Sequence, residues 1–145
     1  MNSLQFVPAT QEDIPVILEQ SKELIDRYED KSLIDYEKVI AWMQRKIASN
    51  IAQYVCVLSA REKVAYYCLV QREEETELDD LYVLPPFQNR GIGSAILKKC
   101  IDEAEKPLML YVFTGNHRAI SLYRRYGFAV TQQVSPTRCI MMRRT

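Results

Sequence analysis

The sequence has little of several features that would assign a chain to a class at once. Lys and Arg together number 19, as do Asp and Glu, so the 145-residue chain carries no net charge. Without a basic surplus there is no general attraction to nucleic acid or to an anionic membrane, and we expect neither as a partner. No apolar run approaches the ~18 residues of a membrane span, and residues 1–10 lack the apolar centre of a signal peptide. We therefore expect a cytoplasmic protein.

Metal-binding and redox motifs are also missing. His117 is the only histidine, and the cysteines are far apart, with no CxxC spacing among them. A structural zinc site needs several such ligands at short spacings, so we expect no metal and free thiols. The four cysteines are Cys56, Cys68, Cys100 and Cys139.

Two of only four glycines lie close together, in a stretch with the pattern of a strand, a loop and a helix. Residues 78–83 include apolar and β-forming side chains, and two prolines then end the strand because they cannot donate to a ladder. Gly91 and Gly93 follow, and a helical apolar pattern begins at Ile92. Free N–H groups at a helix start, beside glycines that admit a ligand to the main chain, favour a phosphate site. Neither the G-x-x-x-x-G-K-[ST] nor the G-x-G-x-x-G motif is present.

The spacing of the apolar residues predicts an α+β fold with a mixed sheet, in the order β-α-α-β-β-β-α-β-α-β-β. The expected strands span residues 4–8, 54–58, 64–70, 78–83, 108–113, 128–133 and 139–143. The expected helices span about 14–28, 35–51, 92–105 and 119–126. The strands on either side of the third helix should be parallel, since a crossover joins them. No linker or repeat interrupts the chain, so we expect one domain over residues 1–145.

Two motifs resemble those of the GCN5-related N-acetyltransferase (GNAT) superfamily. The first is Gln88-x-x-Gly91-x-Gly93 after a V-x-P strand end, and the second is N-x-x-A-x-x-L-Y-x-x-x-G-F at residues 116–128. They occur in the right order with a strand between them, and the order of elements extends the resemblance over nearly the whole chain. The resemblance implies the acyl-CoA N-acyltransferase fold, with splayed central parallel strands, and an acetyl-CoA-dependent N-acetyltransferase activity.

The resemblance also implies where acetyl-CoA would lie. The loop matches the one whose main-chain amides hold the CoA pyrophosphate, and its residues are Gln88, Asn89, Arg90, Gly91, Ile92, Gly93 and Ser94. The strand end matches the segment that pairs with the pantetheine arm, and its residues are Leu81, Tyr82 and Val83. Asn116 matches a residue that bonds the pantetheine or stabilises the gap between the strands, and Ala119 a small residue under the cofactor. Tyr123 matches the tyrosine that faces the sulfur.

Acyl transfer to an amine needs a donor to the developing oxyanion, a proton for the leaving thiolate and an acceptor for the amine proton. A backbone N–H at Tyr82 or Val83 suits the first task, and the Tyr123 hydroxyl suits the second. With reference pKa values of about 10 for tyrosine and about 8.5 for a thiol, full proton transfer is uphill by roughly 2 kcal/mol. Tyr123 therefore either has a lowered pKa or mainly donates a hydrogen bond.

Three carboxylates on the strand before this centre are candidates for the base. Strict alternation places Glu77 and Asp79 on the same face as Leu81 and Val83, and Asp80 on the other. We therefore predict Asp79 as the base and Asp80 as the second candidate. Loss of the amine proton to bulk water before binding is the alternative to both.

The expected reaction is direct attack by a primary amine in a ternary complex, since no cysteine lies at the position that would face the sulfur. The three carboxylates favour a small cationic amine as acceptor. A protein N-terminus or a lysine is the alternative, because the second motif also occurs in ribosomal-protein acetyltransferases. A non-catalytic CoA-binding or sensor module and a structural interaction protein are the interpretations of other classes. An edge strand at the end of the chain could support a homodimer.

Overall fold

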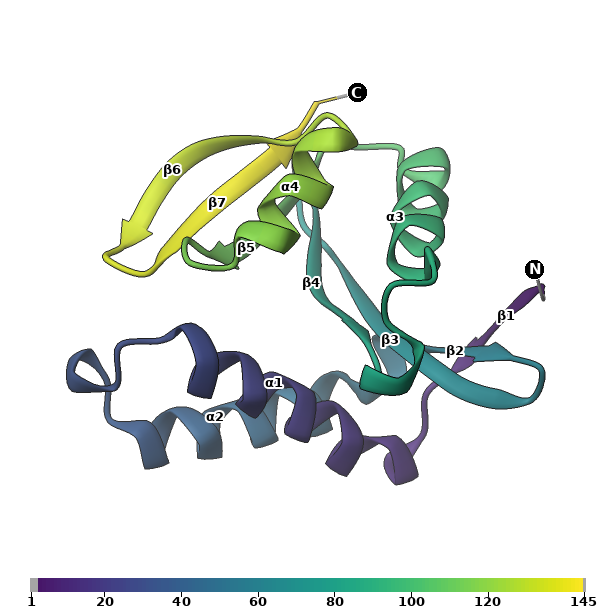
Figure 1. Cartoon of the computed structure of the whole chain (residues 1–145), viewed down its shortest axis with the longest axis horizontal. Helices are drawn as coiled ribbons and strands as arrows, with labels where there is room; N and C mark the ends of the chain where they lie inside the picture. The colour runs from purple at the N-terminus through teal and green to yellow at the C-terminus, as the bar shows by residue number, and fades with distance from the viewer. Residues whose placement is uncertain (1–2, 145) are drawn as a thin grey trace.

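The computed structural model describes residues 3–144, and over these residues it has the predicted order of strands and helices (Figure 1). The strands are β1 (Leu4–Pro8), β2 (Tyr54–Ser59), β3 (Glu62–Gln71), β4 (Thr76–Val83), β5 (Leu108–Phe113), β6 (Ala129–Ser135) and β7 (Arg138–Arg143). The helices are α1 (Ile14–Tyr28), α2 (Tyr36–Asn50), α3 (Ile92–Glu103) and α4 (His117–Arg125). The α+β prediction is confirmed. The assignment of residues 1–145 to one domain stays a prediction, and residues 1, 2 and 145 lie outside the described part.

All the strands join one sheet in the order β1-β2-β3-β4-β5-β7-β6. Neighbours are antiparallel except β4 and β5, which pair in parallel only where Thr76 meets Leu108 and Glu77 meets Met109. Beyond these two pairs the strands separate, so that β5 turns away from the lower half of β4 (Figure 1). The predicted splay of the central parallel strands is therefore confirmed.

The last strand is not an edge strand, which corrects the expectation from the sequence. β7 pairs with β5 on one side and with β6 on the other, so β6 is the edge. β7 therefore lies between β5 and β6, although β6 comes before it in the sequence. Any pairing of two copies through this end of the sheet would have to use β6.

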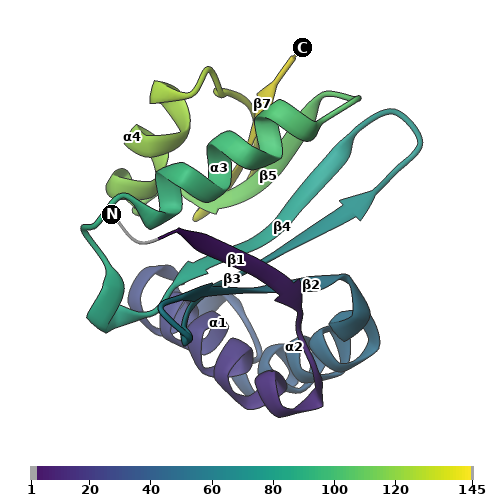
Figure 2. The same ribbon diagram turned by 90° about the vertical axis from the view of Figure 1, so that its right-hand side faces the viewer.

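The helices cover both faces of the sheet in two layers (Figure 2). Helices α1 and α2 pack side by side below one face, while α3 and α4 lie above the other. The buried core on the α1–α2 side consists of Ala9, Ile17, Ile47, Tyr54, Cys56, Tyr66, Cys68 and Tyr82. The larger core on the α3–α4 side includes Val57, Val64, Leu78, Ile96, Leu97, Leu108, Leu110, Phe128 and Met141.

Helix α4 begins two residues before the expected position because Asn116 caps it: the Asn116 Oδ1 atom accepts a hydrogen bond from the Ala119 N–H at 3.2 Å. The turn after α4 requires Gly127, whose φ is +92°. Helix α3 ends at Glu103, short of the expected Glu105. These differences leave the position of both motifs unchanged.

Asp13 ties the start of α1 to the sheet. Its carboxylate accepts hydrogen bonds from the Thr10 N–H at 2.8 Å, from Lys63 Nζ at 2.8 Å and from the Tyr66 hydroxyl at 2.6 Å. Burial alone would raise the pKa of Asp13, but these donors outweigh it and hold the pKa below its ordinary value. Asp13 therefore stabilises the fold most above pH ~4, and this contribution is lost as the pH falls through its folded pKa.

We expect Asp13→Asn to lower the free energy of unfolding by about 2 kcal/mol at pH 7, because a buried charged acceptor is lost. The deficit should shrink as the pH falls from ~4 through the lowered folded pKa of Asp13, below which the wild-type carboxylate is protonated as well. Urea unfolding of both proteins across this range measures it. Glu12→Gln, a neighbouring exposed acid, is the matched control and should change stability by less than ~0.5 kcal/mol. Equal effects of the two variants would contradict the prediction.

Candidate active site

A β-bulge in β4 determines where its acidic side chains point. In the ladder with β3, Cys68 pairs with Asp80 and Leu69 pairs with Leu78, so Asp79 is left without a partner in the register. An extra residue in one strand interrupts the alternation of side chains and increases the local twist. The face of the strand on which each carboxylate lies therefore cannot be counted from the strand end.

The Asp79 carboxylate is directed toward α2. The Nζ atom of Lys46 lies 2.9 Å from Asp79 Oδ2, and the two side chains are only 23% and 15% exposed. Leu81 and Val83 instead pack against the core on the α3–α4 side. The prediction that Asp79 shares a face with Leu81 and Val83 is wrong, because the bulge intervenes.

Asp80 is held by two buried tyrosines. The Tyr82 hydroxyl donates to Asp80 Oδ1 at 2.6 Å, the Tyr54 hydroxyl donates to Oδ2, and Ser21 Oγ lies 2.7 Å from the Tyr82 hydroxyl. Burial raises the pKa of Asp80 to about 6, although the nearby Lys46 ammonium opposes the shift. Each carboxylate oxygen can accept a second hydrogen bond. At neutral pH, Asp80 is thus an ionised carboxylate that can take up a proton.

The end of β4 turns a peptide group toward the gap between β4 and β5. The Leu84 N–H donates to the Val64 carbonyl of β3 at 2.9 Å. Because successive peptide groups in a strand point to opposite sides, the Val83 N–H faces away from β3. The Val83 carbonyl likewise bonds no strand but accepts from Gln88 Nε2 at 2.9 Å. Of the two predicted oxyanion donors, Val83 therefore has the suitable direction and Tyr82 does not.

The loop after β4 presents main-chain N–H groups at the start of α3. A 3₁₀ turn at Pro85–Phe87 leads to Asn89 and Gly91, whose φ angles of +66° and +81° are left-handed. The Gly91 carbonyl accepts the first hydrogen bond of α3 at 3.0 Å. Among the hydrogen bonds of residues 3–144, none comes from the N–H groups of residues 92–94. No atom lies within 4 Å of the place where a Cβ of Gly91 would be, so this turn is open to a ligand.

Helix α4 supplies Ala119 and Tyr123 to the same region. The ring of Tyr123 lies 5.7 Å from that of Phe128, and burial raises the pKa of the Tyr123 hydroxyl above its ordinary value. The hydroxyl therefore stays protonated, which favours a hydrogen-bond donor over a full proton donor. His117, at the first position of α4, is exposed.

Many of these groups line one cleft of about 820 Å³ that lies between the α1–α2 layer and the splayed strands. The residues predicted for cofactor binding that line it are Leu81, Tyr82, Val83, Gln88, Asn116, Ala119 and Tyr123. Asp79 and Asp80 line it as well, and Trp42 reaches it from α2 with 55% of its surface exposed. Residues 89–94 of the glycine loop lie outside this lining.

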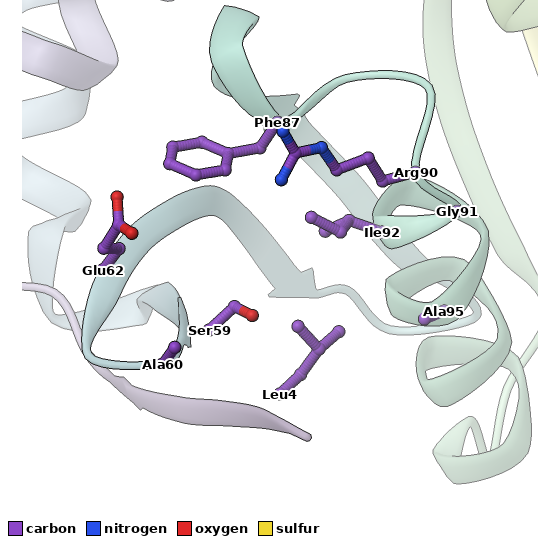
Figure 3. A pocket seen from close by; sticks show the side chains of 9 residues that line it. All are labelled: Leu4, Ser59, Ala60, Glu62, Phe87, Arg90, Gly91, Ile92 and Ala95. Carbon is purple, nitrogen blue, oxygen red and sulfur yellow. The ribbon is translucent and has the colours of Figure 1, made fainter. Parts of the chain in front are cut away.

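A smaller cavity of about 270 Å³ lies beside the glycine loop, toward β1 and the β2–β3 turn (Figure 3). The Arg90 guanidinium lies over the Phe87 ring at 5.6 Å, and both side chains line this cavity. The residues predicted to act in catalysis are not in its lining. The Arg90 side chain is thus directed to the cavity beside Gly91 and Ile92 and not to the larger cleft.

The residues that surround the two aspartates were not identified from the sequence. Lys46 lies 33 positions before Asp79, and Tyr54 lies 26 positions before Asp80, so no local spacing marks either pair. Two adjacent acids inside a predicted strand were a signal in themselves, since buried carboxylates require partners. The two adjacent acids do not, however, indicate which residues are their partners.

No group of three or more His, Cys, Asp or Glu side chains within residues 3–144 is placed to share a metal ion. In the same part of the chain, every helix is too short or too polar to span a bilayer. All four cysteines are buried free thiols, as expected.

A sequence model of the acetyltransferase (GNAT) family matches residues 17–128, which is most of the chain. One relative is the [ribosomal protein bS18]-alanine N-acetyltransferase of Escherichia coli K12, 34% identical over 94 residues, 60% of this chain and 64% of that protein. Another is the thialysine N-epsilon-acetyltransferase of Bos taurus, 41% identical over 54 residues, 34% of this chain and 32% of that protein. Less than two thirds of either relative is therefore matched.

The fold also matches a solved structure over its whole length. The PaiA N-acetyltransferase of Thermoplasma acidophilum, in complex with coenzyme A, aligns with a TM-score of 0.74 and covers 99% of both chains. The two sequences are 20% identical, so this likeness shows the fold alone.

Proposed function

The chain belongs to the acetyltransferase (GNAT) family, and on this basis we propose that it transfers the acetyl group of acetyl-CoA to a primary amine. The observation that carries the proposal is the opening between β4 and β5. An N–H of Val83 without a strand partner faces it, and Asp80 and Tyr123 line the same cleft. A donor for an oxyanion, a base and a donor for a thiolate are thus available in one place.

The residues of the chain fit acetyl-CoA at two places. The N–H groups of residues 92–94, at the positive end of α3, suit a pyrophosphate, and the left-handed Gly91 leaves room for it. The edge of β4 beyond Glu77, which has no strand partner on the β5 side, suits the amide groups of a pantetheine arm. Bound acetyl-CoA supplies a thioester, whose carbonyl carbon is open to attack by an amine.

We assign one role to each residue near the reacting groups. The Val83 N–H stabilises negative charge on the carbonyl oxygen, and the Asp80 carboxylate accepts the proton of the amine. Tyr123 donates a hydrogen bond to the leaving sulfur, and its raised pKa opposes complete proton transfer. Asp79, the first choice from the sequence, is paired with Lys46, and we therefore favour Asp80 as the base.

The acceptor class is supported by the relatives and the cleft together. The relatives act, by their names, on an alanine of a ribosomal protein and on thialysine, which are a peptide amine and a small amine. Both a small cationic amine and a protein amine therefore stay open as acceptors. A cytoplasmic location and a homodimer stay predictions, and the buried free thiols agree with a reducing compartment.

A thiol-release assay with acetyl-CoA and a panel of amines tests the proposal. We expect CoA to appear only when an amine is added, with one acetylated amine formed for each thiol released. The panel should contain small diamines, amino acids and short peptides with free N-termini. Tight binding of acetyl-CoA without turnover of any amine would favour the non-catalytic CoA-binding module instead.

Tyr123→Phe should lower kcat by ~10²-fold if the hydroxyl assists the departure of the thiolate. The affinity for acetyl-CoA should change little, because the ring and its contact with Phe128 are kept. Steady-state kinetics with the best amine of the panel, and calorimetry with acetyl-CoA, measure the two effects. Tyr126→Phe, a change of a half-buried tyrosine on the same segment but outside the cleft lining, is the matched control. An unchanged kcat in Tyr123→Phe would remove this role.

A further inference from the structure

Two acidic side chains of the cleft form salt bridges within the chain. Glu77 pairs with Arg72 and Asp79 pairs with Lys46. Asp80 is bonded by tyrosine hydroxyls. Of the three strand carboxylates that suggested a cationic acceptor from the sequence, two are therefore compensated by basic side chains of the chain itself.

Most of the basic side chains of the cleft have acidic partners as well. Arg27 pairs with Glu23, while Arg72 and Lys46 have the partners named above. Arg138 also lines the cleft, and within the described residues it has no carboxylate within 4.0 Å. The Glu29 carboxylate accepts a hydrogen bond from the hydroxyl of Thr137, the residue before Arg138, and it forms no salt bridge with Arg138.

Arg138 is positioned by aromatic rings. Its guanidinium carbon lies 5.0 Å from the ring centre of Tyr111 and 6.0 Å from that of Phe113, both on the neighbouring strand β5. Tyr111 is 42% exposed, so the stack lies at the cleft surface. Stacking of a guanidinium on ring faces leaves its N–H donors at the edge available for a planar anion. A carboxylate is the planar anion that this fork fits best in a small molecule or peptide.

We propose that Arg138 binds a carboxylate of the acceptor, so that the favoured substrate carries an amine and a carboxylate in one molecule. This inference rests on the proposed function, since it places the amine of the same molecule at Asp80 and Val83 in the same cleft. The carboxylate can belong to a free amino acid or to an acidic side chain of a peptide. Either source presents the same chemistry to Arg138.

The test compares probes that differ only in the carboxylate, with the protein first saturated with CoA. The free amino acid pair is lysine and lysinamide, and the peptide pair has an N-terminal Ala followed by Glu or by Gln. Calorimetry measures affinity, and the fluorescence of Trp42, the single tryptophan, reports whether the probe enters the cleft that it lines. Because binding is measured without turnover, the result does not depend on which amine is acetylated.

We expect the carboxylate form of at least one pair to bind ten-fold or more tightly than its amide, with a change in Trp42 fluorescence. Arg138→Gln should remove the difference and leave the affinity of the amide form unchanged, and Arg138→Lys should keep part of it. Arg27→Gln, the paired arginine of the same cleft, is the control and should keep the full preference. The pair that shows the preference identifies the source of the carboxylate.

Equal binding of both forms in the wild type, no binding of any probe, or a preference that survives Arg138→Gln would overturn the inference. Failure of the proposed function has a different signature, since CoA itself would then not bind or no amine would be acetylated. A protein that binds CoA and acetylates amines without regard to a carboxylate would keep the proposed function and reject this inference.

Discussion

Gly91→Glu is expected to abolish measurable binding of acetyl-CoA while the protein stays folded. The φ of Gly91 is +81°, and the space around a Cβ at this position is open for 4 Å, so the side chain would project where we propose the pyrophosphate lies. A carboxylate there would repel the phosphates and cover the N–H groups of residues 92–94. We expect the Kd to rise by more than ~100-fold, which corresponds to about 2.7 kcal/mol.

Gly91→Ala is the matched control because it introduces the same left-handed strain without charge or length. A residue with a Cβ in this conformation costs roughly 1–2 kcal/mol in stability, so both variants should unfold at a slightly lower urea concentration. Only the Glu variant should lose the cofactor. If acetyl-CoA bound Gly91→Glu as tightly as the wild type, the assignment of this loop to the pyrophosphate would have to be abandoned.

Asp80→Asn is expected to lower kcat by ~10²-fold or more, because positioned base catalysis typically contributes factors of this size. An amide keeps the size of the side chain but cannot accept the amine proton. In the wild type the pKa of Asp80 is raised to about 6, so the active carboxylate form prevails above pH 6 and is lost below it. We therefore expect kcat/KM of the wild type to fall with decreasing pH below about 6, and this limb should disappear in Asp80→Asn.

Asp79→Asn distinguishes the two candidates for the base. The Asp79 charge contributes to the raised pKa of Asp80, and the Lys46 that it holds opposes the shift. Removal of the Asp79 charge should therefore move the acidic limb of the pH profile to lower pH, with kcat largely kept. A loss of the limb together with kcat in Asp79→Asn, and a normal profile in Asp80→Asn, would show that the prediction from the sequence was right.

The sequence predicted most of the fold because its local signals agree with one another. The apolar spacing placed β1 and β5 at their observed bounds, and the glycine loop lies between β4 and α3 as expected. The strand order at the C-terminal end was not predictable in the same way. No local pattern in residues 129–143 predicts that β7 inserts between β5 and β6, because that order depends on contacts distant in sequence.

In the candidate site, too, the features set by local sequence were predictable and those set by distant contacts were not. Gly91 lies directly before α3 and Tyr123 lies on α4, the elements that the sequence predicted for them, and their roles toward acetyl-CoA stay predictions. The face on which Asp79 lies depends on a β-bulge. The bulge arises from the pairing of β4 with β3, and no residue type within β4 predicts it. The charge of the cleft depends on pairs such as Lys46 with Asp79, which come from separate elements of the fold. Counts of acids along one strand cannot reveal such compensation.

Calorimetric titration of the purified protein with acetyl-CoA tests the central claim most directly. Desulfo-CoA and adenosine 3′,5′-bisphosphate serve as comparators, since the first keeps the pantetheine without the sulfur and the second keeps only the nucleotide end. We expect one acetyl-CoA to bind per chain with a micromolar Kd, desulfo-CoA to bind comparably, and the bisphosphate to bind more weakly. No heat of binding with acetyl-CoA under any condition would mean that the glycine loop is only structural, and it would contradict the proposed function.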